Sequence, residues 1–327
     1  MNTLPPVLEV DDLDVTLFTR NGTLPAVEKM SISVGAGETV ALVGESGCGK
    51  SLTALAVMRL LPDPPARTTG GSARLAGRDL LALPEREMVR LRGRDLAMIF
   101  QDPMSALNPV LSVGVQLAEV LRAHTDLPGH AVRERSLELL EHVGIPAAAE
   151  RLDDFPHQLS GGTCQRVMIA MAVACRPRLL IADEPTTALD VTIQAQVLAL
   201  LSDLQRDVGM GMLYISHDLA VVAEIAQRVV VMYAGVKVEE APAETLFAKP
   251  LHPYTRGLLA ATPTPGGPLR APLADIPGRV PALAERPTGC LFAARCALAF
   301  DRCRTERPTL RDAGAGHAVA CFVALPE

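Results

Sequence analysis

Residues 44–51 read Gly-Glu-Ser-Gly-Cys-Gly-Lys-Ser and match the pattern G-x-x-x-x-G-K-[ST] at every fixed position. Glycines let the backbone N–H groups of such a loop turn inward around phosphate oxygens. The Lys50 side chain is long enough to reach β- and γ-phosphates, and the Ser51 hydroxyl can ligate Mg²⁺. The segment therefore predicts a site for a nucleoside triphosphate with magnesium.

A pair of carboxylates, Asp183 and Glu184, follows the apolar run 179–182. Asp183 would hold Mg²⁺, usually through water, and Glu184 would polarise a water that attacks the γ-phosphate. Taken alone, the pair is explained equally well as a solvated acidic turn at the end of a strand.

A second candidate anion site lies at Ser160-Gly161-Gly162, ahead of the helix-like run 167–175. Ser160 is a favourable helix N-cap, and the two glycines leave backbone N–H groups exposed. One nucleotide does not need two such loops, whereas a dimer that holds nucleotides between its subunits does.

The elements that position these residues follow from the apolar pattern. The run 39–43, the glycine loop and a helix-like run from residue 52 form the strand–loop–helix context that the motif needs. Further strands are predicted at 7–15, 30–34, 96–100, 179–182 and 212–216, with a hairpin at 229–233 and 236–239. Residues 62–71 read as turns, and 102–176 as helices broken by Pro and Gly. This alternation predicts an α/β fold with a mostly parallel sheet.

The composition excludes several classes of function. The 327-residue chain carries a net charge of −6 without a dense Lys/Arg run, which argues against a nucleic-acid partner. It has no tryptophan and 3% aromatic residues, so stacking on exposed bases is not expected. The acidic N-terminus does not fit a signal peptide, and no apolar run reaches the roughly 18 residues that span a bilayer. We expect a cytoplasmic protein, either soluble or peripheral to a membrane.

Together, the motifs resemble those of the ATP-binding subunit of an ABC transporter over residues 7 to about 260. The resemblance identifies 44–51 as Walker A, Gln101 as the Q-loop, 159–162 as the signature, Asp183-Glu184 as Walker B, 188–190 as the D-loop and His217 as the switch histidine. It implies a P-loop ATPase core with a RecA-like subdomain and an antiparallel β subdomain, over 1–101 and 177–249. Residues 102–176 would be the helical signature subdomain.

The resemblance also assigns roles. The P-loop of one subunit and the signature of another would clamp the same ATP, which water attacks in line. The catalytic residues would be Lys50, Gln101, Glu184 and His217, and the Mg²⁺ ligands Ser51, Gln101 and Asp183. The chain's own nucleotide would contact Gly44, Ser46, Gly47, Gly49, Lys50, Ser51, Leu52, Gln101 and Asp183. Ser160, Gly161 and Gly162 would contact the partner's nucleotide, and Asp190 would communicate across the interface.

Three positions depart from the family pattern or leave its assignment open. Thr163 and Cys164 stand where the signature usually continues with glutamine or, in peptide importers, methionine. A helix N-terminus can lower the pKa of a thiol such as Cys164, although a small packing residue is the simpler interpretation. Phe18 is the nearest candidate to stack on adenine, with a strand core residue as the alternative.

The last segment, 250–327, is rich in proline and holds four of the seven cysteines: Cys290, Cys296, Cys303 and Cys321. Structural zinc usually shows a C-x₂₋₄-C pair, which is missing here. An iron–sulfur cluster also takes four thiolates and tolerates varied spacing. The spacing alone leaves a cluster, zinc and free cysteines open.

The segments 101–109, 252–255, 277–278 and 287–290 resemble those of dipeptide and oligopeptide importer ATPases. In some of those subunits such cysteines hold a [4Fe–4S] cluster, so the resemblance implies one here, with zinc as the alternative. It also implies a second ATPase subunit, favoured as a heterodimer, two permease subunits and an extracytoplasmic peptide-binding protein. The chain would lie at the cytoplasmic face of the membrane. Glutathione-like peptides or metal complexes are alternative substrates, and a soluble ABC ATPase is the alternative class.

Overall fold

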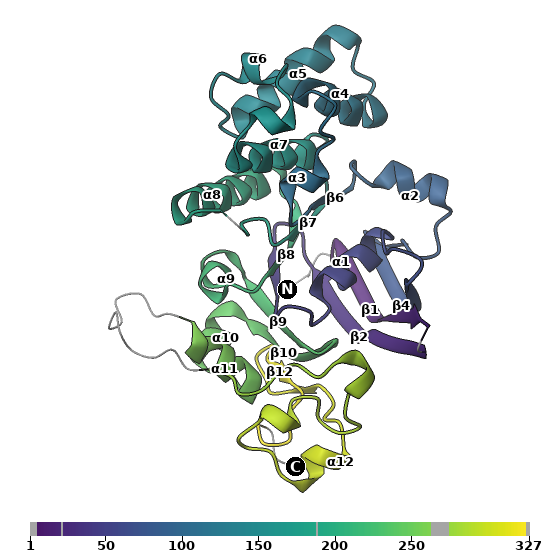
Figure 1. Ribbon diagram of the computed structural model, residues 1–327, viewed down its shortest axis with the longest axis vertical. Helices are drawn as coiled ribbons and strands as arrows, with labels where there is room; N and C mark the ends of the chain where they lie inside the picture. Colours follow the sequence, from purple (N-terminus) through teal and green to yellow (C-terminus); the bar gives the residue numbers. More distant parts are fainter. Residues whose placement is uncertain (1–4, 21, 188, 263–274, 325–327) are drawn as a thin grey trace. The chain divides into compact units, whose positions relative to one another are not determined.

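The computed structural model describes residues 5–20, 22–187, 189–262 and 275–324 (Figure 1). The chain divides into two compact units, each of which is made of three separate segments of the sequence. The first unit takes residues 1–7, 35–38 and 82–213, and the second takes 8–34, 39–81 and 214–327. The boundaries that we drew from motifs, at residues 101, 176 and 249, differ from this division. The C-terminal segment belongs to the same unit as the Walker A loop.

The first unit is mainly helical around two parallel strands. Strands β6 (Leu96–Ile99) and β7 (Leu179–Asp183) pair in parallel, with Leu96 opposite Leu179. The helices are α2 (Glu85–Leu91), α3 (Pro103–Ala106), α4 (Val113–His124), α5 (Gly129–His142), α6 (Ala148–Arg151), α7 (Gly161–Val173) and α8 (Val191–Val208), with a 3₁₀ turn η1 at Pro156–Gln158. Helices α4 and α5 pack on each other and on α7, which confirms the predicted helical segment (Figure 1).

The core of this helical segment follows from apolar residues one helical turn apart. Leu117 and Leu121 on α4 are buried, as are Leu140 on α5 and Val167 on α7. Such spacing places apolar side chains on one face of each helix, so packing the faces together removes them from water. The chain passes from the first unit to the second within β8 (Gly211–Ser216).

The second unit contains an antiparallel sheet in the order β2-β1-β4-β5. Its strands are β1 (Leu8–Thr19), β2 (Gly22–Val34), β4 (Ala66–Leu75) and β5 (Arg78–Asp79). The predicted strands 7–15 and 30–34 were too short, and the turn prediction for 62–71 was wrong beyond residue 65. These strands alternate buried and exposed residues, so their outer halves lack the continuous apolar run on which the prediction relied.

The same unit contains the strands that flank the Walker A loop. Strand β3 (Thr39–Val43) is parallel to β9 (Arg228–Tyr233), which forms the predicted hairpin with β10 (Val236–Pro242). Two short strands, β11 (Arg311–Asp312) and β12 (Ala318–Val319), extend from β10. The helices are α1 (Lys50–Met58), α9 (Leu219–Ile225), α10 (Ala243–Ala248), α11 (Pro253–Ala261) and α12 (Asp301–Thr305), with 3₁₀ turns η2 (Leu283–Glu285) and η3 (Ala293–Arg295). The α/β class is confirmed.

Buried polar contacts attach the C-terminal segment to the strands of its unit. The fully buried Glu239 carboxylate on β10 accepts hydrogen bonds from the backbone N–H groups of Leu251 and His252, and its Oε1 lies 2.7 Å from His317 Nε2. On β2, Glu28 pairs with Arg286 at 2.7 Å and with Arg307 at 3.0 Å. Because buried carboxylates and guanidinium groups need partners, these contacts fix where the segment lies.

Within the described residues, we find no helix that combines the length and the apolar character required to cross a bilayer.

We expect Glu28→Ala to lower the free energy of unfolding by about 2 kcal/mol, because it leaves a buried guanidinium without its carboxylate. The Arg286 side chain is only 6% exposed. Glu9→Ala is the matched control, since Glu9 pairs with Arg74 on the surface and such pairs contribute at most about 1 kcal/mol. Denaturant unfolding of the three proteins measures the difference, and equal stability of the two variants would contradict the argument.

Candidate nucleotide site

The Walker A loop joins β3 to α1, as predicted. Gly44, Gly47 and Gly49 all have positive φ angles, of 155°, 77° and 108°. A Cβ on Gly44 would lie 2.2 Å from the backbone oxygen of Met232, and one on Gly49 would lie 2.7 Å from the Met232 Cε. Glycine is thus required twice at Gly44, by the backbone conformation and by the close approach of the β9 backbone. At Gly49 the backbone conformation requires it, because the Met232 methyl group can move aside.

Lys50 is the first residue of α1 and is 5% exposed. Its Nζ donates hydrogen bonds to the backbone oxygens of Gly44, at 2.8 Å, and Glu45, at 3.1 Å. The ammonium is therefore held inside the curve of the loop, where a phosphate would compete with these two carbonyls. Ser51 and Leu52 follow in the first turn of the helix.

In the first unit, the structure brings together the Q-loop and the Walker B glutamate. Gln101 Nε2 donates to Glu184 Oε2 at 2.9 Å, and Thr187 Oγ1 donates to the same oxygen at 3.0 Å. Glu184 has a φ of +47°, a backbone conformation that is uncommon for a residue with a side chain and often found at functional sites. Asp183 is buried at the end of β7. Sequence reasoning missed Thr187, although a hydroxyl three residues after the carboxylate is a usable signal.

The signature residues lie at the start of α7. The Ser160 hydroxyl accepts a hydrogen bond from the Thr163 N–H at 3.2 Å, which confirms the predicted N-cap. A Cβ on Gly161 would meet no atom within 4 Å, so the backbone is open to an approaching group there. Gly162 has less free space, because a Cβ there would lie 3.2 Å from Ile193 Cγ2.

Cys164 is a packing residue. Its side chain is fully buried, its Sγ donates to the Pro156 oxygen at 3.5 Å, and burial raises its pKa above the usual value of a thiol. The lowered pKa that we considered for this position was wrong, because desolvation outweighs the helix N-terminus. Burial raises the pKa of Cys48 and Cys175 in the same way.

Asp190 and His217 each lie just before a helix. Asp190 caps α8 by accepting hydrogen bonds from the N–H groups of Thr192, at 3.0 Å, and Ile193, at 2.9 Å. His217 is exposed between β8 and α9, and Asp218 caps α9. Within the predicted D-loop, Ala188 lies outside the described residues. The interface role of Asp190 stays a prediction.

Phe18 lies on β1 in the antiparallel sheet and is 43% exposed, so the alternative that it is a core residue was wrong. The Arg67 guanidinium carbon lies 5.5 Å from the centroid of its ring. Whether adenine stacks there stays a prediction.

The four cysteines of the C-terminal segment come together. They line one narrow space of ≈ 10 Å³, room for about one water molecule, and Phe292 lines the same space. Burial raises the pKa of Cys290 to about 11, and the neighbouring thiols contribute to the shift. Over the described ranges, no group of three or more His, Cys, Asp or Glu side chains has an arrangement that could hold a metal ion.

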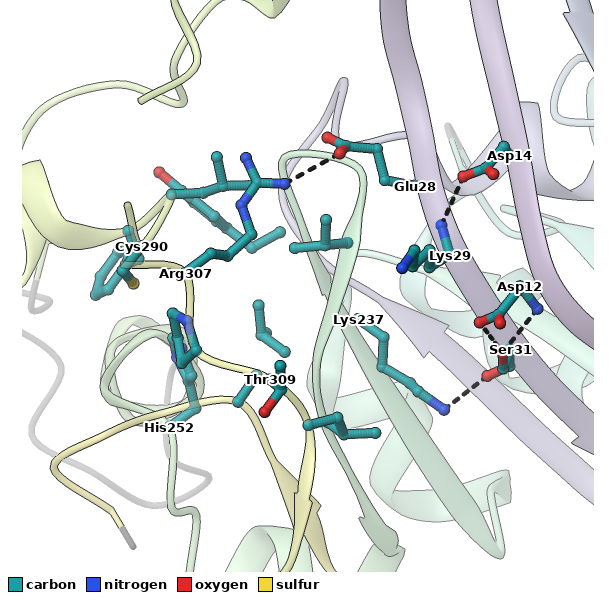
Figure 2. Close-up of a pocket in the computed structure, with 18 residues that line it drawn as sticks. Asp12, Asp14, Glu28, Lys29, Ser31, Lys237, His252, Cys290, Arg307 and Thr309 are labelled. Atoms are coloured by element: carbon teal, nitrogen blue, oxygen red, sulfur yellow. Dashed lines mark hydrogen bonds and ion pairs between the residues drawn. The ribbon is translucent and has the colours of Figure 1, made fainter. Parts of the chain in front are cut away.

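A larger cavity of ≈ 590 Å³ lies in the second unit between β2, β10 and the C-terminal segment (Figure 2). Several of its charged side chains are paired with neighbours: Arg307 with Glu28 at 3.0 Å, and Lys237 Nζ with the Ser31 oxygen at 2.7 Å. Cys290 contributes to this cavity as well as to the cysteine pocket. The sequence did not predict the cavity, since its walls come from distant segments.

We expect Gly44→Ala to abolish nucleotide binding and to lower the free energy of unfolding by about 3 kcal/mol or more, because β9 must move to admit the methyl group. Gly37→Ala is the control: its φ is also positive, at 67°, but a Cβ there meets nothing within 4 Å. It should cost only about 1 kcal/mol. Denaturant unfolding and titration with a fluorescent ATP analogue test both. Similar losses in the two variants would refute the steric argument.

Comparison with known proteins shows the family to which the chain belongs. The family model "ABC transporter" matches residues 27–187, and the model "Oligopeptide/dipeptide transporter, C-terminal region" matches residues 238–303. A dimeric ATP-binding cassette in a post-hydrolysis state, bound to ADP and phosphate, superposes with a TM-score of 0.65 at 25% identity, covering 72% of this chain and 98% of that chain.

Three relatives extend over nearly the whole chain. The dipeptide transport ATP-binding protein of Escherichia coli (strain K12) is 49% identical, covering 98% of both chains. The oligopeptide transport ATP-binding protein of Bacillus subtilis (strain 168) is 47% identical over 97% of this chain and 96% of its own. A probable peptide ABC transporter ATP-binding protein of Sinorhizobium fredii is 49% identical over 97% of this chain and 94% of its own. The chain therefore belongs to the ATP-binding proteins of ABC transporters, in the group that carries the oligopeptide/dipeptide transporter C-terminal region.

Proposed function

We propose that this chain hydrolyses ATP to drive the import of dipeptides or oligopeptides across the cytoplasmic membrane. The observation that carries the proposal is that one chain joins a complete set of ABC ATPase motifs to the peptide-transporter C-terminal region. The full-length identity to peptide-transport ATP-binding proteins supports the substrate class.

In this proposal the Walker A residues hold the phosphates of the chain's own nucleotide. The loop N–H groups and the first turn of α1 bind phosphate oxygens, and Lys50 moves from its two carbonyl partners to the β- and γ-phosphates. Ser51, Gln101 and Asp183 are the candidate ligands of Mg²⁺, which supplies positive charge against the developing charge on the phosphates. A buried carboxylate such as Asp183 suits this hard cation.

Glu184 is the candidate general base. The hydrogen bonds from Gln101 and Thr187 converge on one of its oxygens, so they fix the carboxylate in one orientation. A fixed carboxylate can accept a proton from the attacking water as the water oxygen bonds to the γ-phosphorus and the bond from that phosphorus to the bridging oxygen of the leaving ADP breaks. His217 would contact the γ-phosphate.

The exposed start of α7 supports a two-subunit site. Ser160, Gly161 and Gly162 offer backbone N–H groups to the nucleotide of a partner subunit, and the similar solved cassette is described as dimeric. We propose a heterodimer with a second ABC ATPase at the cytoplasmic face of the membrane. Two permease subunits and an extracytoplasmic peptide-binding protein complete the transporter.

A [4Fe–4S] cluster on Cys290, Cys296, Cys303 and Cys321 is part of the proposal. Its support is that these four side chains line one pocket. The thiols that hold a cluster surround several irons and lie further apart than the ligands of one ion, so the lack of a single-ion arrangement counts mainly against zinc. The pocket is narrow, and binding a cluster requires the thiols to move outward and lose their protons. The cluster would tie this segment into a small folded body.

We expect Glu184→Gln to keep ATP binding but to reduce ATP hydrolysis and peptide uptake by roughly 100-fold or more in transporter reconstituted with its permeases and binding protein. Glu134→Gln on the exposed face of α5 is the matched control, with activity as in the wild type. Unchanged hydrolysis in the first variant would remove Glu184 from catalysis. Wild-type hydrolysis without any peptide uptake would refute the import proposal.

We expect anaerobically purified protein to contain about four irons per chain, with equivalent sulfide and an absorption band from iron–thiolate charge transfer. Cys296→Ser should lose most of the iron, whereas Cys175→Ser, outside the pocket, should keep it. Metal and sulfide quantitation measures this. Stoichiometric zinc, or iron retained without these cysteines, would contradict the cluster.

A further inference from the structure

Glu45 occupies one of the variable positions of the Walker A motif, so the motif itself gives this residue no role. In the structure its carboxylate forms a two-pronged ion pair with Arg295 of the C-terminal segment. Arg295 Nη1 lies 2.6 Å from one carboxylate oxygen and Nη2 lies 2.9 Å from the other. A bidentate pair of this kind fixes orientation as well as distance.

Arg295 itself is held from several sides. Its side chain is 5% exposed, its Nε donates to the Pro277 oxygen at 2.8 Å, and its Nη2 also donates to the Ile276 oxygen at 3.1 Å. The guanidinium carbon lies 5.8 Å from the centroid of the Tyr233 ring. The guanidinium can therefore adopt few other positions, and it transmits its own placement to Glu45.

The C-terminal segment also binds the backbone of the loop. The Glu45 N–H donates to the Tyr254 hydroxyl oxygen at 2.8 Å, and Tyr254 is fully buried. The Tyr254 ring packs edge-on against Tyr233, with 4.7 Å between centroids. Helix α11 and turn η3 thus hold the same loop residue at two points, its N–H and its carboxylate.

These contacts matter at the moment when a phosphate binds. Lys50 bridges the carbonyl oxygens of Gly44 and Glu45 and so helps to shape the loop. A phosphate takes the ammonium away from both oxygens. The loop then keeps its form only through contacts that do not involve Lys50, and a preformed loop binds more tightly because less ordering is needed on binding.

We propose that Arg295 is a positioning residue of the nucleotide site, through which the cysteine-containing segment sets the affinity for ATP. Arg295 directly precedes Cys296, and its guanidinium carbon lies 5.9 Å from the ring centroid of Phe292, a residue that lines the four-cysteine pocket. A change in that pocket therefore acts on the residue that holds the loop. The inference rests on the proposed ATPase function and adds a route of regulation to it.

The test compares the ATP affinity and the thermal stability of purified full-length variants, with Mg-ATP as the probe. Arg295→Met should weaken ATP binding about 10-fold. The affinity of Arg295→Lys should lie between that of Arg295→Met and the wild type, because lysine keeps the charge but lacks the paired N–H groups that bind both carboxylate oxygens. Glu45→Gln should weaken binding to a similar extent with little effect on packing. The double variant Arg295→Met, Glu45→Gln should bind no more weakly than Arg295→Met alone.

Arg286→Met is the matched control, since Arg286 is a second buried arginine of the same segment that pairs with Glu28 on β2. It should lower the melting temperature while leaving the ATP affinity of the folded protein unchanged. Equal ATP affinity in wild type, Arg295→Met and Glu45→Gln would overturn the inference. Equal loss of affinity in Arg286→Met and Arg295→Met would overturn it too, by showing a general effect of stability. Wild-type protein that does not bind ATP would refute the proposed function itself.

Discussion

The close approach of the Walker A backbone to β9 is the constraint on which the nucleotide site depends. Gly44 sits where any side chain would collide with the Met232 carbonyl, and its positive φ turns the chain away from the direction of β3. The loop can therefore surround an anion only if β9 stays in place. Strand β9 is in turn paired with β3 and β10, so the core of the second unit supports the loop from behind.

Paired charges determine how the C-terminal segment attaches to this core. Its regular elements are short, with two-residue strands and helices of one or two turns, so it gains little from secondary structure alone. It is instead attached through Glu239, Glu28 and Glu45, each of which meets a buried nitrogen donor of the segment. Leaving any of these groups unpaired is costly in the interior, so the three attachments fix where the segment lies on these strands.

Local features were predictable from the sequence, and contacts between distant segments were not. The glycine loop, strand β3 and the Ser160 cap depend on neighbouring residues, whose pattern is visible in one stretch of sequence. Strand β4 was missed because its glycines were read as turns, although Gly71 is there because β1 passes too close for a side chain. The contact of Glu184 with Gln101 joined two motifs that had been recognised separately, whereas its contact with Thr187 was not predicted. The Glu45–Arg295 pair had no sequence signal at all, because it joins residues from opposite ends of the chain.

The cysteine pocket and the nucleotide loop are connected through turn η3, whose Arg295 pairs with Glu45 of the loop. Close-packed side chains pass a shift on to their neighbours rather than absorbing it, and directional contacts pass it on to the groups that they bind. Turn η3 carries Arg295, while Cys290 and Cys296 flank that turn closely in sequence. Any ligand that spreads the thiols must therefore also act on the backbone that positions the guanidinium. Its effect reaches Glu45 directly, because the bidentate pair tolerates little change in distance or angle before one of its two hydrogen bonds is lost.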